Sequence, residues 1–175
     1  MKRIILALLS ASALLTTILA ARAERMDTSP LPDGTVASRI LIDKSERTLT
    51  LFRHDRELKT YKVALGRNPV GHKQQEGDGR TPEGRYTITF HKENSSFHRA
   101  LRISYPNAED VRSARERGVP PGGDIMIHGL PNGMGSLGAN HLLRDWTEGC
   151  IAVTNEEIEE IWRAVPDGTV VEITP

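Results

Sequence analysis

Short strand-like runs recur through most of this 175-residue chain, and in most of them apolar and polar residues alternate. Alternation with a period of two puts every second side chain on one face of an extended strand, a pattern that an amphipathic helix does not produce. The runs lie at residues 40–42, 48–51, 60–65, 85–90, 101–105, 125–127, 151–153 and 169–173. Tight polar turns join the first three, which predicts an antiparallel meander. Many short strands with few helices predict a mainly β domain, either a sandwich or a partly closed barrel.

Two segments show helical signals instead. Residues 154–165 place four apolar side chains at i, i+3, i+4 and i+7, on one helical face: Ile158, Ile161, Trp162 and Val165. Thr154 and Glu157 stand at capping-box spacing at the start of this segment. Residues 107–117 predict a shorter helix that Asn107 caps. The expected fold is therefore mainly β with one or two short helices.

Three segments carry neither periodicity. Residues 66–84 contain five glycines and two prolines, and loops of this length in compact domains are more often functional or mobile than idle. Residues 91–98 are expected to be a polar connection between two strands. Residues 129–147 are expected to be a connection rich in glycine and asparagine. We find no internal repeat and no low-complexity tract.

The first 23 residues have the organisation of a secretory signal peptide. Lys2 and Arg3 precede an apolar stretch over residues 4–21, and an A-x-A cleavage site ends at Ala23. The alternative is an uncleaved membrane anchor, since the apolar stretch is at the lower edge of spanning length. No cysteine follows the stretch closely enough to carry a lipid. We therefore expect cleavage and export to the periplasm or cell envelope.

The rest of the chain divides into a short tether and one domain. Residues 24–37 contain Ser-Pro, Leu-Pro and Asp-Gly pairs, which are typical of irregular structure. Residues 38–175 suffice for one domain of ordinary size with an adequate core. Cleavage removes three basic and no acidic residues from a chain of formal net charge zero, which leaves a charge of −3. A slightly acidic chain gives no indication of a general nucleic-acid binder, so we expect no nucleic-acid partner.

Cys150 is the chain's only cysteine. Exported proteins usually hold cysteines in disulfide pairs, so a lone one is an intermolecular bridge, a functional thiol or an inert buried side chain. His128 lies 22 residues upstream, and each residue stands beside a glycine and a strand-like run. Taken alone, His128 also fits a structural histidine at a strand end. If folding brings the two together, they supply a nucleophile and a base.

The residues around Cys150 add two features that suit acyl transfer. Backbone N–H groups around Glu148, Gly149 and Cys150 are candidates for an oxyanion hole, since glycine permits unusual φ angles and close approach of a ligand. Positive dipoles or a protonated imidazole beside the thiol would lower its pKa and supply thiolate. A metal site on Cys150, His128 and His141 is a weaker alternative, because no pair of ligands has the spacing of a zinc motif.

Three motifs in order resemble the L,D-transpeptidase catalytic domains that act on bacterial peptidoglycan. They are Ile127-His128-Gly129, Thr147-Glu148-Gly149-Cys150-Ile151 and, upstream, Thr81-Pro82-Glu83-Gly84-Arg85-Tyr86. The first three predicted strands, at residues 40–42, 48–51 and 60–65, match the family as well. The resemblance covers roughly residues 38–174. It implies a β-sandwich-like domain with the cysteine at one end of a sheet under a mobile flap.

The resemblance also implies a reaction. Cys150 would attack the carbonyl between the third residue of a peptidoglycan stem peptide, a diamino acid, and the terminal D-Ala. His128 would act as the base, and the N–H groups of Gly149 and Cys150 would stabilise the oxyanion. D-Ala would leave, and an amine from a second stem or from a cell-wall-attached protein would resolve the thioester. No metal or cofactor is required, because the thiolate is itself the nucleophile.

The chain departs from the family pattern at three points. Many members have histidine where this chain has Glu148, and arginine or asparagine where it has Ala152. The spacer from His128 to Cys150 is also longer than is common in the family, with an insertion around residues 134–144. These departures leave the acyl acceptor and the ligand of the substrate carboxylate open. The candidates for substrate contact are Gly129 and Thr147, beside the catalytic pair, and three arginines that suit a carboxylate: Arg144, Arg80 and Arg67.

Three kinds of function are consistent with these residues. The favoured one is a transpeptidase. Water as acceptor would make the same site a carboxypeptidase or amidase, and loss of catalysis would leave a cell-wall binding module.

Overall fold

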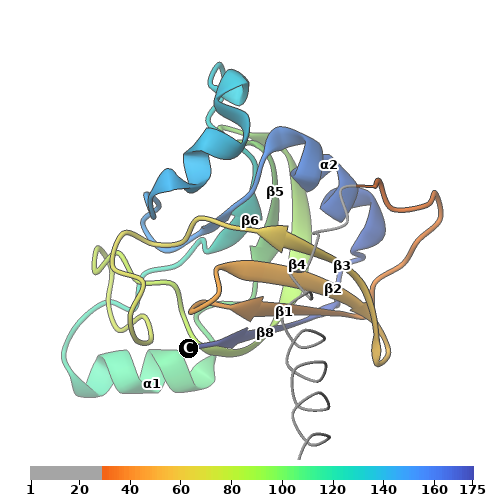
Figure 1. Ribbon diagram of the computed structural model, residues 1–175. Helices are drawn as coiled ribbons and strands as arrows, with labels where there is room; N and C mark the ends of the chain where they lie inside the picture. The colour runs from red at the N-terminus through yellow and green to blue at the C-terminus, as the bar shows by residue number, and fades with distance from the viewer. Residues whose placement is uncertain (1–28) are drawn as a thin grey trace, which may run out of the picture.

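The structure, a computed structural model, describes residues 29–175 (Figure 1). The strands are β1 Arg39–Asp43, β2 Thr48–Arg53, β3 Arg56–Lys62, β4 Gly84–Ser95, β5 His98–Ile103, β6 Met126–His128, β7 Ile151–Ala152 and β8 Val170–Thr174. The helices are α1 Ala108–Glu116, α2 Asn155–Ala164 and the 3₁₀ helix η1 Gly135–Leu143. The predicted signal peptide, residues 1–23, and the first part of the predicted tether lie outside the described residues.

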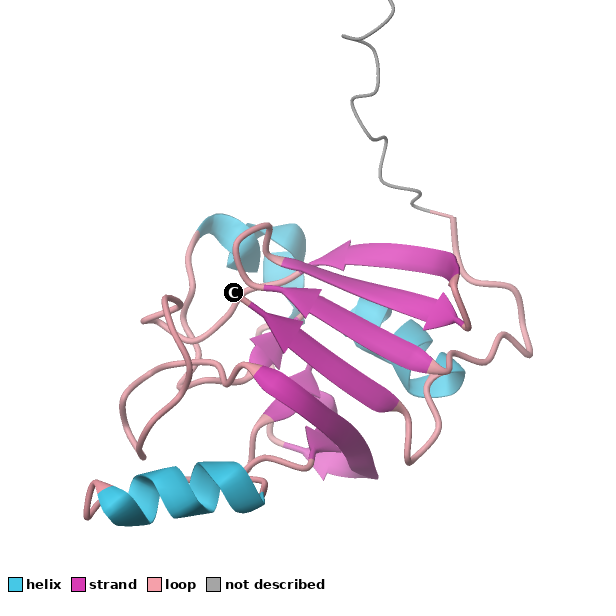
Figure 2. Cartoon of the chain, turned by 90° about the horizontal axis from the view of Figure 1, so that it is seen from below, coloured by secondary structure: helices cyan, strands magenta, loops and turns pink. Residues whose placement is uncertain are grey.

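All eight strands belong to one sheet, in the order β3-β2-β1-β8-β4-β5-β6-β7. The first three form the predicted antiparallel meander. The last strand, β8, lies between β1 and β4 and runs parallel to β1, with Ile40 opposite Val171 and Ile42 opposite Ile173 (Figure 2). The chain's C-terminal strand therefore joins the meander to the half of the sheet that carries β6 and β7.

The two ends of the strand order meet. The predicted strand at 60–65 divides, because β3 ends at Lys62 and Ala64 makes a separate bridge to Ala152 of β7. Ala64 and Ala152 exchange two backbone hydrogen bonds, of 2.9 and 2.8 Å. Gly66 then bridges to Thr147. The fold is thus mainly β and partly closed, as predicted.

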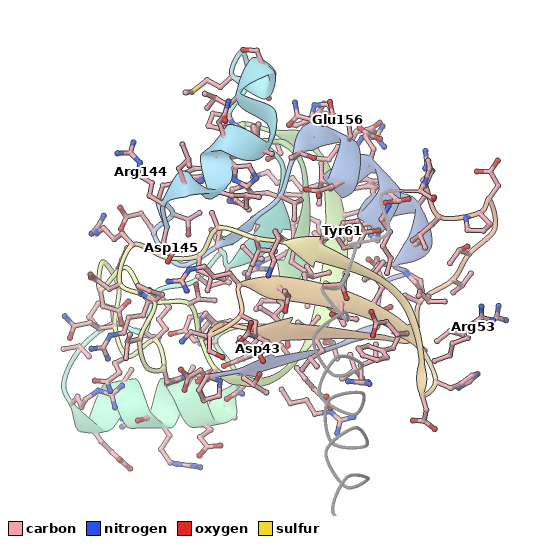
Figure 3. The ribbon with its side chains drawn as sticks, viewed as in Figure 1. Asp43, Arg53, Tyr61, Arg144, Asp145 and Glu156 are labelled. Carbon is pink, nitrogen blue, oxygen red and sulfur yellow. The ribbon has the colours of Figure 1, made fainter. Side chains whose placement is uncertain are left out.

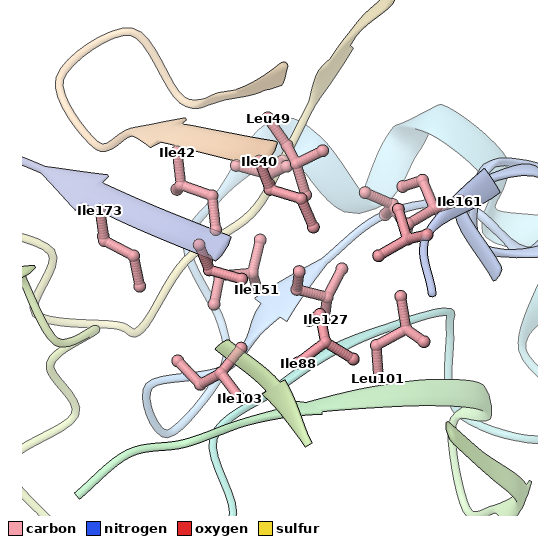
Figure 4. Packing of buried hydrophobic residues seen from close by; sticks show 14 of the residues in the cluster. Ile40, Ile42, Leu49, Ile88, Leu101, Ile103, Ile127, Ile151, Ile161 and Ile173 are labelled. Carbon is pink, nitrogen blue, oxygen red and sulfur yellow. The ribbon is translucent and has the colours of Figure 1, made fainter. Parts of the chain in front are cut away.

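One hydrophobic core fills the space between the halves of the sheet. Figure 4 shows side chains from β1, β8, β6, β7 and α2 meeting there. Its fully buried members include Ile40, Ile42, Leu49, Leu101, Ile127, Ile151 and Ile161. Burying each of these side chains contributes about 1.5–3 kcal/mol. The core therefore fixes β6 and β7, which carry the candidate site, against the rest of the sheet.

Both predicted helices form and carry capping boxes. Thr154 caps α2, accepting a hydrogen bond from the Glu157 N–H while the Glu157 side chain accepts one from the Thr154 N–H. Asn107 and Asp110 do the same at α1. Helix α2 packs against β5 (Figure 1). Local capping was therefore sufficient to predict α1, and capping together with one apolar face was sufficient to predict α2.

The polar connection predicted at residues 91–98 is wrong. Strand β4 continues to Ser95 and pairs with β5 as a hairpin, with Lys92 opposite Ala100 and Ser95 opposite His98. The end of β4 projects beyond the core, so both of its faces are largely polar and the apolar alternation that marks a strand is lost.

The connection predicted at residues 129–147 contains the 3₁₀ helix η1, which the sequence did not indicate. His141 is the one buried residue of η1, and Gly138 interrupts it with φ 46°. A single buried side chain gives no apolar periodicity.

The described part of the predicted tether packs on the domain. Residues 29–37 contain no helix or strand. The Ala37 N–H donates to the carbonyl of Ala164, the last residue of α2, at 2.7 Å, and the Leu31 N–H donates to the carboxylate of Glu160 in the same helix. No helix within residues 29–175 is both long and apolar enough to cross a membrane.

Candidate active site

Folding brings Cys150 and His128 to neighbouring strands. His128 ends β6, and Cys150 immediately precedes β7. The two strands are parallel, with Ile127 opposite Ile151 in the core. Because side chains alternate along a strand, His128 and Cys150 both leave the sheet on the side away from those two isoleucines. Both residues line the same pocket.

The pocket has a volume of about 360 Å³, which suits a short peptide segment or another small ligand. The hairpin of β4 and β5 forms one wall, and the segments before β6 and β7 form the others. Its lining residues are Lys92, Ser95, Ser96, Phe97, Ala100, Asp124, Met126, His128, Trp146, Thr147, Glu148 and Cys150. The hairpin, rather than the 66–84 loop or the 107–118 segment, therefore stands over the candidate catalytic pair.

His128 is held as a neutral base. Its side chain is 3% exposed, and its ring packs against Phe97 and Trp146, with centroid distances of 4.5 and 5.9 Å. Its Nδ1 lies 2.7 Å from the Gly129 carbonyl oxygen. A carbonyl only accepts, so this contact assigns the proton to Nδ1 and leaves Nε2 free to take a proton. Burial lowers the pKa of His128 to about 4.

Cys150 is held as a neutral thiol. Burial raises the pKa of the Cys150 thiol above its ordinary value of 9.0. Its Sγ lies 3.6 Å from the Asp124 carbonyl oxygen, to which the thiol donates. The prediction that the surroundings would lower the pKa of this thiol is therefore wrong, because desolvation outweighs the Met126 backbone hydrogen bond and the charge of Lys73. At neutral pH the two side chains are therefore a neutral thiol and a neutral imidazole.

Thr147 holds the loop that presents Cys150. Its hydroxyl donates to the Cys150 carbonyl at 2.7 Å and accepts from the Gly149 N–H at 3.1 Å. The Thr147 side chain lines the pocket but is buried, and its hydroxyl is committed to these two bonds. An oxyanion role for the Gly149 N–H would require one of them to break. Thr147 thus fixes the position of the Cys150 backbone, whereas substrate contact by the Thr147 hydroxyl gains no support.

Gly149 stands where a side chain has no room. Its φ is +130°, and an added Cβ would lie 2.5 Å from the Arg80 carbonyl oxygen. We expect Gly149→Ala to destabilise the fold by about 2–4 kcal/mol, from backbone strain and overlap together. Gly168 is a matched control, since its φ is +84° but nothing lies within 4 Å of an added Cβ. Gly168→Ala should cost only about 1 kcal/mol.

Chemical unfolding of the two glycine variants measures this difference. Equal losses of stability would show that the close approach of Arg80 to Gly149 is unimportant and that only the backbone angle matters.

The 66–84 loop is a support for the cysteine loop. Thr81, the first residue of the upstream motif, is fully buried and accepts from the Gly66 N–H at 3.0 Å. The Arg67 N–H donates to the Thr147 carbonyl at 2.9 Å. Lys44, 3% exposed, ties the loop together through the carbonyls of Gly71 and Thr81 at 2.7 and 3.1 Å. The upstream motif therefore acts on the site through packing and hydrogen bonds.

The predicted arginine ligands do not gather at the pocket. Arg67 pairs with the exposed Glu148 at the pocket rim. The Arg80 guanidinium reaches the His72 carbonyl at 3.4 Å and lines no part of the pocket. Figure 3 shows Arg144 directed away from the body of the protein. None of the three contributes to the pocket wall, so the predicted carboxylate ligand is not identified among them.

Gly129 also lies outside the pocket wall. Its carbonyl accepts from His128, and an added Cβ would lie 2.8 Å from Asn155 Oδ1. Gly129 therefore orients the base and allows α2 to approach closely, and its predicted contact with substrate gains no support.

Sequence reasoning missed the aromatic wall of the pocket. Phe97 and Trp146 stack with a centroid distance of 6.2 Å and both contact the His128 ring. The available signal was the position of Trp146, directly before the Thr147 motif. An aromatic residue beside a candidate nucleophile can form a pocket wall.

The chain is similar to several known proteins. The model of the L,D-transpeptidase catalytic domain family, YkuD, matches residues 37–173. The chain is 33% identical over 132 residues to YafK of Escherichia coli K12, whose name describes it as an L,D-transpeptidase. The match covers 72% of this chain and 46% of YafK. It is 30% identical to the L,D-transpeptidase-type protein YkuD of Bacillus licheniformis, covering 82% of this chain and 69% of that protein. Among solved structures, the chain superposes on the K307A mutant of Pgp2, the helical cell shape determining protein from Campylobacter jejuni. The TM-score is 0.61 and the sequence identity is 26%, and the match covers 83% of this chain and 49% of that one.

The structure shows a mainly β domain in which a thiol and an imidazole line one pocket. The chain belongs to the L,D-transpeptidase catalytic domain family. It spans about half the length of YafK and of Pgp2.

Proposed function

We propose that the protein is a cysteine-dependent L,D-transpeptidase that acts on peptidoglycan stem peptides through a thioester on Cys150. One observation carries the proposal: Cys150 and His128, 22 residues apart in the sequence, line one pocket beside a paired strand end. Family membership supports peptidoglycan as the substrate class.

The protonation states indicate the order of events. Nε2 of His128 takes the thiol proton as Sγ of Cys150 attacks the carbonyl carbon between the diamino acid and the terminal D-Ala. The proton then passes to the nitrogen of D-Ala, which leaves, and the stem remains as a thioester. An acceptor amine attacks the thioester, gives its proton to His128, and the proton returns to the Cys150 sulfur. The backbone N–H of Cys150 is the better oxyanion donor, because that of Gly149 is bonded to Thr147.

Hydrolysis at the same site is the second candidate. Ala152 is fully buried and paired to Ala64, so no polar side chain stands where many family members carry arginine or asparagine. A group that would hold the carboxylate of a donor or acceptor is therefore missing from that position. Water as the acceptor would give a carboxypeptidase or amidase.

Incubation with purified tetrapeptide-stem muropeptides tests the proposal. We expect an acyl-enzyme on Cys150, seen as a mass increase of the intact protein, and cross-linked or amine-exchanged stems. If only free, shortened stems form, transfer is excluded in favour of hydrolysis. If no covalent adduct and no product forms from any stem, both enzymatic proposals fail.

Export belongs to the same proposal. The A-x-A site ending at Ala23 favours cleavage and a mature protein in the periplasm or cell envelope, where peptidoglycan is accessible. N-terminal sequencing of the protein recovered from the envelope fraction checks this. A start near Glu24 is expected, whereas retention of Met1 would contradict cleavage.

A further inference from the structure

Lys92 lines the same pocket as the candidate catalytic pair. Among the described residues it is the one lysine or arginine of the pocket wall. Its side chain is exposed, and it forms no ion pair and no side-chain hydrogen bond within residues 29–175. Most exposed lysines are simply solvated, so the position of Lys92 relative to the reacting groups decides whether it has a role.

The strand register places Lys92 on the same face of the sheet as His128. Lys92 of β4 stands opposite Ala100 of β5, and Ala100 stands opposite His128 of β6. Directly paired residues of antiparallel strands project from the same face. The next residues along β5 and β6, Leu101 and Ile127, belong to the hydrophobic core, so the row of Lys92, Ala100 and His128 is on the opposite face, that of the pocket.

This row brings the lysine within reach of the candidate base. Adjacent strands are separated by about 4.8 Å, so the Cα atoms of Lys92 and His128 lie roughly 10 Å apart. The flexible four-carbon stem of a lysine covers more than half of such a distance. Ala100, which stands between them, carries only a methyl group. The ammonium group of Lys92 can therefore lie within the length of one amino-acid residue of the His128 ring.

The other ionisable groups of the pocket wall carry no uncompensated charge. Both acidic side chains are paired with arginines that lie outside the wall: Asp124 with Arg102 at 3.2 Å, and Glu148 with Arg67. His128 is neutral at pH 7 because burial lowers its pKa to about 4. Within the described wall, the positive charge of Lys92 is therefore the one charge without a partner. Such a cation suits a carboxylate of the ligand.

The proposed reaction defines which part of the stem lies nearest to Lys92. The nitrogen of the terminal D-Ala takes its proton from Nε2 of His128, so D-Ala lies on the His128 side of the bond that Cys150 attacks. From Cys150, at the start of β7, the strand order continues through β6 and β5 to β4. The leaving residue therefore extends from His128 toward Lys92, and its carboxylate is two bonds from its nitrogen.

We propose that Lys92 binds the carboxylate of the leaving residue, the terminal D-Ala, and thereby restricts the reaction to stems with a free C-terminus. This inference rests on the proposed function. Lys92 is a specificity-determining residue: its ammonium group donates to the carboxylate, and it takes no part in the movement of protons between Cys150 and His128. The cation comes from β4, whereas many family members carry an arginine or asparagine at the position of Ala152.

The test compares two stems that differ only in that carboxylate. One is a tetrapeptide-stem muropeptide with a free terminal D-Ala, the other ends in D-alaninamide, and release of the terminal residue is followed by chromatography. We expect Lys92→Met to raise KM for the free stem about tenfold, the effect of losing one charge-assisted hydrogen bond, with kcat within about threefold. For the amide stem, KM should change less than about twofold, because that stem has no terminal charge for Lys92 to bind.

Three controls make the result specific to the charge of Lys92. Lys92→Arg keeps a positive charge and should restore KM for the free stem to within about threefold of the wild-type value. Lys62→Met removes the same charge from β3, outside the pocket wall, and should leave KM for both stems unchanged. Added salt should raise KM of the wild-type protein for the free stem more than that of Lys92→Met.

The outcomes separate this inference from the proposed function. A fall of kcat/KM by one factor on both stems in Lys92→Met is the signature of a structural role or of contact with another part of the stem. It overturns the inference and leaves the proposed function in place. So does an unchanged KM in Lys92→Met, or a wild-type protein that turns over the two stems equally well. Failure of the wild-type protein to form an acyl-enzyme with either stem overturns both.

Discussion

Replacing Cys150 with alanine is expected to lower turnover of a tetrapeptide stem by about 10⁴-fold or more and to abolish the acylated species in the intact mass spectrum. The proposed reaction forms its only covalent intermediate on this sulfur, and within residues 29–175 no other cysteine is present to replace it. Product formation is followed by chromatography of the muropeptides. Because the side chain is small and lies beside the pocket, the variant should remain folded.

The matched control is Cys150→Ser, which keeps the size and a hydroxyl donor for the Asp124 carbonyl but is a far weaker nucleophile at neutral pH. Both variants should unfold within a few degrees of the wild-type protein. Turnover by Cys150→Ala above a tenth of the wild-type rate, in a protein shown to be folded, would refute Cys150 as the nucleophile.

Acidification is expected to destabilise the protein between pH 6.5 and 4, largely through His128. The pKa of His128 falls from 6.5 in the unfolded chain to about 4 in the folded protein, because burial disfavours the charged ring. Above pH 6.5 the ring is neutral in both states and its full contribution is present. As the pH falls below 6.5 the unfolded state binds the proton first, so stability is lost until about pH 4. The expected loss is about 3 kcal/mol.

Urea unfolding across this pH range measures the effect, and His128→Asn is its control. Asparagine keeps an N–H for the Gly129 carbonyl but does not titrate. Most of the dependence of the unfolding free energy on pH should therefore disappear in this variant. Burial also lowers the pKa of His141, which adds a smaller loss of stability on acidification. The lowered pKa values of Asp43, Asp78 and Glu160 act mainly below pH 4.5. Equal slopes in the wild type and His128→Asn would show that His128 is not buried as a neutral ring.

Elements with local signals could be predicted from the amino-acid sequence. Helix α2 follows from its capping residues and its apolar face, and it forms at Asn155–Ala164 within the predicted residues 154–165. The meander follows from period-two alternation and short turns. The two motifs of the candidate site could also be identified, because a lone cysteine and a histidine, each beside a glycine, stand out in a chain that is predicted to be exported.

Contacts between distant segments could not be predicted, because they form only when the chain folds. The parallel pairing of β1 with β8 and the bridge from Ala64 to Ala152 close the fold, and neither leaves a local pattern. The end of β4 was misread because its side chains leave the core, where apolar alternation has no role. The support that Thr81 gives to the Gly66 backbone likewise depends on a contact that no spacing reveals.

The protonation states of the site belong to the same category. Sequence showed that a thiol and an imidazole were present, and the expected thiolate proved wrong because burial raises one pKa and lowers the other. The burial of the ring nitrogens of His141, within the insertion at residues 134–144, and of Trp146, shortly after it, likewise left no sign in the sequence. Residue types and local periodicity can be read directly from the sequence. The desolvation of a titratable group depends on which distant residues cover it, and those residues come together only when the sheet closes.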